Sequence, residues 1–440
     1  MKPFHVLYLR FPSIKKNNHL LPFSSHSITS LFLPPLSLYC TFVFTTMNGS
    51  DLDSSSAHTK ISAVIFDLDG TLLDTEKLIQ RVLKEFLEQY GKDMDIEKEE
   101  KRTGKSWRES APSIVKDYDL PLTVTDFSNE IMPLFHKRWP EVKALPGANR
   151  LIRHLSNHGV QFGLASNSIR RNIEEKISFQ QGWKDLFLVI IGGDEVEHEK
   201  PSPDIFYEAS RRMNVDPAQC LVIEDSLVGV TSANSAKMKV VAVPSCVTQA
   251  KNYSADSVLH SLLEFQPECW GLPEFKDWEK NALPIEPMYV VGLLKGEPHD
   301  SSMILDLNAG RGSSVSLPDQ VSGIYFGWGT LSVHERFKVV VSIGWDLQSH
   351  FARRVIKPCF IREFGNDIYE EQLQLLIVGY IRQLSSEENV LGASEILRKD
   401  LSIAEAALDL PNFSHHRSDP LLAKATVDDQ IATTCLCCRK

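Results

Sequence analysis

Residues 61–75 read ISAVIFDLDGTLLDT, and this stretch decides the fold of the 440-residue chain. An apolar run of strand length ends in Asp67 and Asp69, one residue apart, and a glycine follows them. Such a run predicts a buried parallel strand, and α/β sheets place their chemistry at the carboxyl ends of strands. Two acids at that edge repel each other unless a cation lies between them, so the pair predicts a Mg²⁺ site. Asp67 is then placed to act as a nucleophile and Asp69 to transfer a proton, the alternative being an acidic turn that caps a helix.

The composition is that of an ordinary soluble protein, and the length suggests at least two domains. The formal net charge is −10, and lysines and arginines do not cluster with aromatic residues, so a nucleic-acid surface is not expected. The eight cysteines do not form paired zinc-ligand spacings, which favours a reducing compartment. No membrane partner is expected, because the apolar residues 28–46 are interrupted by Pro34-Pro35 and make a poor spanning helix.

The two ends of the chain differ in composition from its body. Residues 1–60 are interpreted as a leader and linker that is disordered or used for targeting. The first acidic residue is Asp51, and the preceding stretch is basic and rich in Ser, Pro, Leu and Phe. This composition is typical of transit peptides to a plastid or mitochondrion; alternatively, translation starts at Met47 and the protein is cytoplasmic. Residues 414–440, which include three cysteines, are predicted to be a disordered tail.

The body of the chain begins with an α/β pattern over residues 61–268. Strand-like runs at 162–165, 188–191, 220–223 and 240–243 alternate with helical sequence, which predicts a doubly wound parallel sheet. A helical block at about 77–143 interrupts the alternation and is too long for one crossover. We expect it to form a cap over the strand ends.

A second domain is predicted over residues 284–413, after a linker at 269–283 in a proline-rich region. Short strand-like runs occur at 288–294, 323–328, 337–345 and 373–380, and helical sequence follows at 392–408. This order predicts a small antiparallel β-barrel with a terminal helix.

Three more chemistry-bearing segments follow the aspartate pair, each beside a predicted strand. Ser166 and Asn167 end one strand, and a helix N-terminus that favours anions begins shortly after them. Lys200 lies in a proline-bounded loop, where its charge suits a phosphate and the nucleophile together. Glu224 and Asp225 end another buried strand and suit a magnesium ion. Each residue alone has a structural explanation, such as a helix cap or a surface charge, but their common placement favours one site.

These residues resemble the four motifs of the haloacid dehalogenase-like hydrolase superfamily, over roughly residues 61–245. The resemblance implies an aspartyl-phosphate mechanism in which Asp67 attacks phosphorus and Asp69 first protonates the leaving oxygen and then activates water. It implies that Ser166, Asn167 and Lys200 bind the phosphoryl group. The Mg²⁺ ligands that it implies are Asp67, the carbonyl of Asp69, and Asp225, with Glu224 nearby.

The whole chain also resembles a narrower family, the plant bifunctional FMN hydrolase/riboflavin kinases, from about residue 61 to 413. The segments that carry this similarity include LPGANRLIRHL at 145–155, SGIYFGW at 322–328 and IVGYIR at 377–382. In that family, an N-terminal phosphatase hydrolyses FMN and a C-terminal flavokinase barrel phosphorylates riboflavin with ATP. FMN, riboflavin and ATP are therefore the small-molecule partners that the resemblance implies.

Two departures from that family predict a weak or inactive kinase. The Pro-Thr-Ala-Asn element, which serves Mg-ATP in flavokinases, does not occur in this chain, and GRGS at 310–313 passes almost directly to Ser322. Lys357 stands where the family has its catalytic glutamate. A protonated lysine cannot accept the hydroxyl proton of riboflavin, whereas a carboxylate can.

The sequence therefore predicts a Mg²⁺-dependent FMN phosphatase fused to a degenerate kinase domain. Two other enzymatic readings stay open: a fully bifunctional enzyme, and a phosphatase for another small ester such as a sugar or glycerol phosphate. A flavin sensor without activity is disfavoured, because all the acids of the phosphatase site are intact.

Overall fold

Six parallel strands form the first sheet of the protein, in the order β3-β2-β1-β4-β5-β6. The structure, a computed structural model, describes residues 60–102, 104–244, 253–297, 300–307, 317–331, 336–346, 353–362, 371–384 and 396–422. The predicted α/β architecture with a parallel sheet is confirmed. The strands are β1 (Ala63–Phe66), β2 (Gln161–Ser166), β3 (Val189–Gly192), β4 (Cys220–Glu224), β5 (Lys239–Ala242) and β6 (Ser257–Val258).

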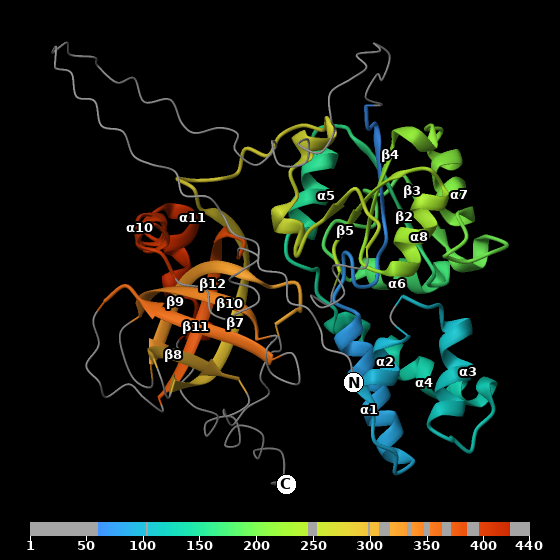
Figure 1. Ribbon diagram of the computed structural model, residues 1–440, viewed down its shortest axis with the longest axis horizontal. Helices are drawn as coiled ribbons and strands as arrows, with labels where there is room; N and C mark the ends of the chain where they lie inside the picture. The colour runs from blue at the N-terminus through green and yellow to red at the C-terminus, as the bar shows by residue number, and fades with distance from the viewer. Residues whose placement is uncertain are drawn as a thin grey trace, which may run out of the picture. The chain divides into compact units, whose positions relative to one another are not determined.

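Helices cover both faces of this sheet, because alternate strand residues point to opposite sides. Val64 and Phe66 of β1 pack in one apolar cluster, which also holds buried residues of α5 (Ala148–Asn157) and α6 (Arg170–Ser178). Ala63 and Ile65 belong to a second cluster, with buried residues of α7 (Asp204–Met213) and α8 (Leu227–Ser235). The result is the doubly wound arrangement seen in Figure 1. Two short 3₁₀ turns, η2 (Gly193–Glu195) and η3 (Pro217–Gln219), lie in the connections.

The predicted cap is a group of helices inserted between β1 and β2. It consists of α1 (Glu76–Gln89), α2 (Ile96–Glu100), α3 (Trp107–Asp117), α4 (Val124–Arg138) and the 3₁₀ turn η1 (Trp139–Glu141). Helices α3 and α4 begin where the Ser106 and Thr123 side chains accept backbone N–H groups. Apolar residues of α1 and α4 recur every three or four positions and are buried in one cluster. Figure 1 shows these helices gathered beyond one end of the parallel strands.

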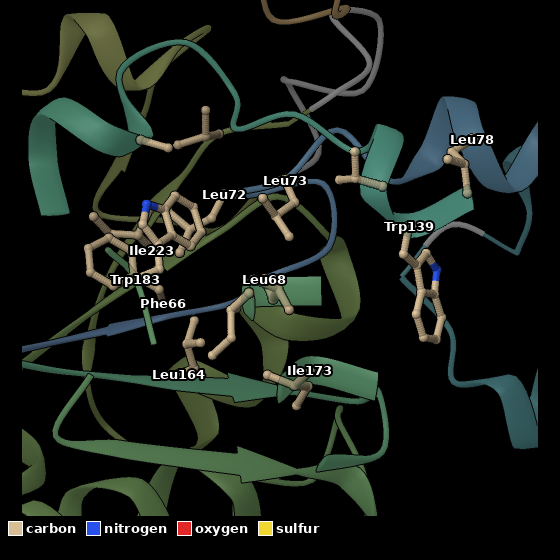
Figure 2. Packing of buried hydrophobic residues seen from close by; sticks show 14 of the residues in the cluster. Phe66, Leu68, Leu72, Leu73, Leu78, Trp139, Leu164, Ile173, Trp183 and Ile223 are labelled. Atoms are coloured by element: carbon tan, nitrogen blue, oxygen red, sulfur yellow. The ribbon is translucent and has the colours of Figure 1, made fainter. Parts of the chain in front are cut away.

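Buried apolar side chains hold the loop after β1 in place. Leu68, Leu72 and Leu73 are fully buried, and in the sequence Asp67 and Asp69 flank Leu68. Figure 2 shows these leucines in the same cluster as Phe66 and Ile223. Burial of each leucine is worth about 2 kcal/mol, so the apolar positions hold the loop while its polar ones stay available.

The second sheet is antiparallel and has six strands in the order β11-β10-β9-β12-β7-β8. The edge strands β8 and β11 also contact each other, so the sheet curls into a nearly closed barrel, as predicted. Two of the strands, β8 and β11, were not predicted, because their sequences alternate poorly and β11 contains Pro358. The strands are β7 (Leu283–Glu297), β8 (Asp300–Asp306), β9 (Gly323–Leu331), β10 (Phe337–Asp346), β11 (Arg353–Phe360) and β12 (Gln372–Arg382).

The barrel has an interior core and a separate outer cluster. Val339, Val341 and Ile343 of β10 pack in the interior, whereas Val340 packs outside with apolar residues of α10 (Arg398–Ala407). Helix α11 (Pro411–Ser414) and the turns η8 (His415–Ser418) and η9 (Pro420–Leu422) follow α10. The turns η5 (Leu262–Glu264) and η6 (Pro267–Trp270) lie between the two sheets in the sequence.

The predicted ends of the chain are only partly described. Ordered structure continues to residue 422, further than the predicted end of the barrel domain at 413, because Leu422 is buried in the outer cluster. The rest of the predicted tail, the leader up to residue 59 and the GRGS segment at 310–313 lie outside the described residues.

Gly327 offers a test of the barrel packing. A Cβ atom at this position of β9 would come within 1.9 Å of the Leu376 carbonyl oxygen on β12. We expect Gly327→Ala to lower the free energy of unfolding by about 1–3 kcal/mol, since two backbones must move apart. Urea denaturation followed by circular dichroism measures this loss.

The control is Gly344→Ala on the neighbouring strand. Its Cβ would meet only the Cδ1 atom of Leu384, at 2.9 Å, and a flexible side-chain tip can move away. Equal losses of unfolding free energy in Gly327→Ala and Gly344→Ala would contradict the close approach of the β9 and β12 backbones.

Candidate active site

The carboxyl ends of three central strands meet at the acids that the sequence predicted. Phe66, the last residue of β1, is paired with Leu164 of β2 and with Ile223 of β4. The next residue, Asp67, donates its backbone N–H to the Ile223 carbonyl at 3.0 Å. Asp67 therefore lies between the ends of β2 and β4, as a parallel sheet requires.

Lys200 joins these strand ends. Its Nζ donates hydrogen bonds to Asp67 Oδ1 at 2.7 Å, to Glu224 Oε1 at 2.8 Å and to the Ala165 carbonyl oxygen at 2.8 Å. Its three N–H bonds are thus all used. The Lys200 side chain is only 2% exposed, so the ammonium is held by its partners and not by water.

Asn167 fixes the loop that carries Lys200. The backbone N–H of Lys200 donates to Asn167 Oδ1 at 3.0 Å, and Asn167 Nδ2 donates to the Lys200 carbonyl at 3.4 Å. Ser166 lies beside it at the end of β2 and is buried, and its Oγ accepts the backbone N–H of Ser168 at 3.2 Å. The structure therefore brings these predicted binding residues together with Lys200.

Glu224 and Asp225 have different surroundings. Glu224 Oε1 accepts from Lys200, and Oε2 accepts from the backbone N–H and the hydroxyl of Ser226, at 2.8 and 2.9 Å. Asp225 Oδ1 accepts from the Thr71 hydroxyl at 3.1 Å. A Cβ at Gly70 would come within 2.2 Å of Asp225 Oδ2, so the backbone of the first loop closely approaches this carboxylate. Asp225 thus faces the aspartate loop, whereas Glu224 supports Lys200.

Burial and mutual repulsion dominate the electrostatics of this group. Burial raises the pKa of Asp67, and the Lys200 ammonium opposes that effect. Burial and the neighbouring Glu224 raise the pKa of Asp225 well above its usual value. Burial alone would lower the pKa of Lys200, but the Asp67 and Glu224 carboxylates outweigh it and raise the pKa.

These charges fit a divalent cation. Asp67, Glu224, Asp225 and Lys200 are all buried, and in ionised form they leave two negative charges without compensation. Carboxylate and carbonyl oxygens are the ligands that Mg²⁺ prefers. Within the described residues, no group of three or more His, Cys, Asp or Glu side chains is arranged to hold a metal. The fit therefore rests on the Asp67 and Asp225 carboxylates with the Asp69 carbonyl, and Glu224 is already engaged elsewhere.

Asp69 has partners that the sequence did not predict. Lys176 Nζ donates to Asp69 Oδ1 and Oδ2 at 2.7 and 2.8 Å, and the Ser168 hydroxyl donates to Oδ2 at 2.7 Å. Burial would raise the pKa of Asp69, but Lys176 and the hydrogen bonds outweigh it and lower the pKa. A signal for Lys176 was present, since it lies between Ile173 and Ile177 on the buried face of α6.

Comparison with known proteins supports both predicted domains. Residues 64–243 match the haloacid dehalogenase-like hydrolase family, and residues 308–408 match the riboflavin kinase family. A bifunctional riboflavin kinase/FMN phosphatase from Arabidopsis thaliana is 45% identical over 377 residues, which cover 84% of this chain and 99% of that protein. The chain belongs to the bifunctional riboflavin kinase/FMN phosphatase family.

Other proteins similar to this chain match only its first domain. A probable pseudouridine-5'-phosphatase from Drosophila melanogaster is 39% identical and covers 50% of this chain and 97% of its own length. The crystal structure of CbbY from Rhodobacter sphaeroides with phosphate is 30% identical, has a TM-score of 0.42, and covers 46% of this chain and 96% of its own. The family model over residues 64–243 and the Arabidopsis relative confirm the resemblance, and the first domain is a phosphatase of the haloacid dehalogenase-like type.

Lys357, which the sequence analysis predicts to occupy the position of the family's kinase base, lies on β11. Lys357 is half-buried and is paired across the strands with Ser342 of β10. Its neighbour Ile356 packs in the barrel interior, so Lys357 points to the opposite face of the sheet.

Within the part of the chain that the structure describes, no helix is long and apolar enough to cross a membrane.

Gly229 tests the support of Lys200 by Glu224. A Cβ at this position of α8 would lie 1.6 Å from Glu224 Oε1, so Gly229→Ala must displace the carboxylate. Helix propensity alone would favour alanine by about 1 kcal/mol, yet we expect phosphatase kcat/KM to fall at least about tenfold because Lys200 loses a partner. Initial rates with p-nitrophenyl phosphate and a thermal melt measure the two effects separately.

A control on the same helix is Thr231→Ala, since Thr231 is exposed and donates only to the Leu227 carbonyl within its own helix. Full activity of a folded Gly229→Ala protein would show that the Glu224 position does not matter for the reaction.

Proposed function

We propose that the first domain hydrolyses FMN to riboflavin through a phosphorylated Asp67, and that the barrel domain is a weak or inactive riboflavin kinase. The observation that carries the phosphatase mechanism is the buried contact of Lys200 with both Asp67 and Glu224, at 2.7 and 2.8 Å. It places a cation beside the nucleophile at the end of β1, where a phosphoryl group must approach.

In the first half of the reaction, a carboxylate oxygen of Asp67 attacks phosphorus in line, and the bond from phosphorus to the leaving oxygen breaks. The protonated form of Asp69, which the second half of the reaction regenerates, gives its proton to that oxygen as it leaves, and Lys176 and Ser168 stabilise the carboxylate that remains. Ser166 would donate to a phosphoryl oxygen, and the Lys200 ammonium, which is bonded to Asp67, would bring positive charge close to these oxygens as their negative charge grows in the transition state.

In the second half, Asp69 accepts a proton from a water molecule as the water attacks the phosphorus of the aspartyl phosphate. The bond between phosphorus and Asp67 then breaks, and inorganic phosphate is released. Asp67 and Asp225, with the Asp69 carbonyl, would hold Mg²⁺, which supplies positive charge to the phosphoryl oxygens when bound.

FMN is proposed as the substrate because the Arabidopsis relative, which is matched over 99% of its length, is named for FMN phosphatase activity. The competing substrates are other small esters, since relatives named for pseudouridine-5'-phosphate and glycerol-3-phosphate are 39% and 38% identical to the first domain. The four motifs do not distinguish among these esters, so we assign substrate choice to residues outside the motifs, with the cap helices beyond the strand ends as candidates.

The deciding experiment is a panel of phosphate esters assayed with Mg²⁺ and with EDTA. We expect FMN to give the highest kcat/KM, and we expect EDTA to abolish turnover because two buried carboxylates then repel each other. Phosphate release and riboflavin fluorescence measure the reaction. Glycerol or sugar phosphates as the preferred substrates would refute FMN but keep the phosphatase.

A matched variant tests the mechanism in the same panel. Asp67→Asn removes the nucleophile, so its activity should fall by more than about a thousandfold on every substrate, with the fold retained. An Asp67→Asn protein with full activity would refute the aspartyl-phosphate route.

The kinase proposal has its own test with riboflavin, ATP and Mg²⁺. We expect FMN formation to be absent or far below the rate of FMN hydrolysis, and the Asp67→Asn background prevents product loss during the assay. Lys357→Glu alone should not restore activity, because the Pro-Thr-Ala-Asn element is also missing from the sequence. Chromatographic detection of FMN measures both proteins.

The outcomes of this kinase assay distinguish the effect of Lys357 from that of the missing Pro-Thr-Ala-Asn element. Kinase turnover at an ordinary rate in the parent would refute the proposal and leave a fully bifunctional enzyme. Recovery in Lys357→Glu would assign the loss to the base position alone.

A further inference from the structure

Lys176 and Ser168 form a closed set of hydrogen bonds with Asp69. The Lys176 ammonium contacts both oxygens of the Asp69 carboxylate and donates to the Ser168 hydroxyl at 3.2 Å. The Ser168 hydroxyl in turn donates to Asp69 Oδ2. All three N–H bonds of the ammonium are thereby used within this set.

The three residues come from three separate elements. Asp69 lies in the loop after β1, Ser168 in the loop after β2, and Lys176 on the second turn of α6. The ring of Trp139, at the end of the cap, lies 5.4 Å from the Lys176 Nζ atom. Asp69 is therefore held by Ser168 and Lys176, and the Trp139 ring at the end of the cap lies near the Lys176 ammonium.

The burial of the Lys176–Asp69 ion pair distinguishes it from an ion pair on the protein surface. The Lys176 side chain is 6% exposed, compared with 22% for Asp69. Burying an ammonium is strongly unfavourable unless its partners replace water, whereas exposed ion pairs contribute little to stability. A methionine at this helical position would fill the same space without that cost, so the lysine needs a reason beyond packing.

We propose that Lys176 is a positioning residue that fixes the Asp69 carboxylate for proton transfer, with Ser168 as the second anchor. This inference rests on the proposed mechanism, in which Asp69 delivers a proton to the leaving oxygen and later takes one from water. A carboxylate with two soft torsions would otherwise sample several orientations, and a misplacement of 1 Å costs about a hundredfold in rate. Lys176 does not touch the substrate in this proposal.

The leaving group provides a readout that a purely structural role would not move. An alkyl phosphate must receive a proton as its alkoxide leaves, whereas p-nitrophenolate leaves well as an anion. Loss of Asp69 positioning therefore slows attack on alkyl esters selectively, as seen in kcat/KM. It also slows the later attack of water, which is common to both substrates and limits kcat.

The experiment compares Lys176→Met, Lys176→Arg and a control, Arg171→Met, in the full chain. Arg171 is an exposed basic residue of the same helix, so the control removes the same charge. For Lys176→Met we expect kcat/KM to fall about a hundredfold for the best alkyl ester, and less than about tenfold for p-nitrophenyl phosphate. Rapid mixing should show a burst of p-nitrophenolate, since the aspartyl phosphate accumulates.

A double-mutant cycle with Asp69→Asn identifies the route of the effect. If Lys176 acts through Asp69, then Lys176→Met adds little further loss once Asp69 has been replaced. Lys176→Arg keeps a buried cation and should recover part of the alkyl-ester activity. This variant also preserves the test if the methionine protein proves unstable in a thermal melt.

Three results would overturn the proposal: equal losses on both substrates without a burst, full additivity with Asp69→Asn, or wild-type rates in a folded Lys176→Met protein. The alkyl ester is the one that the substrate panel selects, so a substrate other than FMN does not affect this test. Failure of the aspartyl-phosphate route itself would appear separately, as activity retained by Asp67→Asn.

Discussion

The ammonium group of Lys200, buried between Asp67 and Glu224, is the constraint on which the catalytic domain depends. Removing an ammonium and a carboxylate from water costs several kcal/mol each, and only close partners recover that cost. The three acceptors of Lys200 belong to the end of β2, the end of β4 and the loop after β1. These strand ends must therefore stay in register for the charge to be tolerated. The same register places the nucleophile next to the cation that a phosphoryl group requires.

The backbone packs closely around the buried acids at the ends of β1 and β4. Gly70 and Gly229 stand where any side chain would overlap the carboxylates of Asp225 and Glu224. Each glycine lets the backbone come within contact distance of an acid and so restricts its rotamers. The acids are thereby held near each other despite their repulsion, and a divalent cation bound between them would relieve that repulsion.

The sequence was sufficient for features that depend on local pattern. The run before Asp67 and the run before Glu224 are apolar and bounded by acids, so both strands and their chemistry could be read directly. The β8 and β11 strands pair with the strands that precede them, β7 and β10, but they were missed because their own residues do not alternate clearly between apolar and polar. Lys176 was missed for another reason. Its role depends on how α6 is rotated against the loop after β1, and helical spacing shows only that its side of the helix is buried.

The two domains show how differently a fold and a site depend on particular residues. In the barrel, Ile343 and Ile356 face the interior across paired strands, whereas Lys357 lies on the other face. A change between glutamate and lysine at this position would leave the interior packing unchanged, so the barrel fold does not depend on which of them is present. In the catalytic domain, by contrast, removing Lys200 would leave Asp67 and Glu224 as uncompensated buried charges, at a cost of about 3–5 kcal/mol. Stability therefore retains the phosphatase residues together, whereas it places no such requirement on the kinase base. Similarity along the whole chain supports both folds, and the weak or inactive kinase remains a proposal that rests on Lys357 and on the missing Pro-Thr-Ala-Asn element.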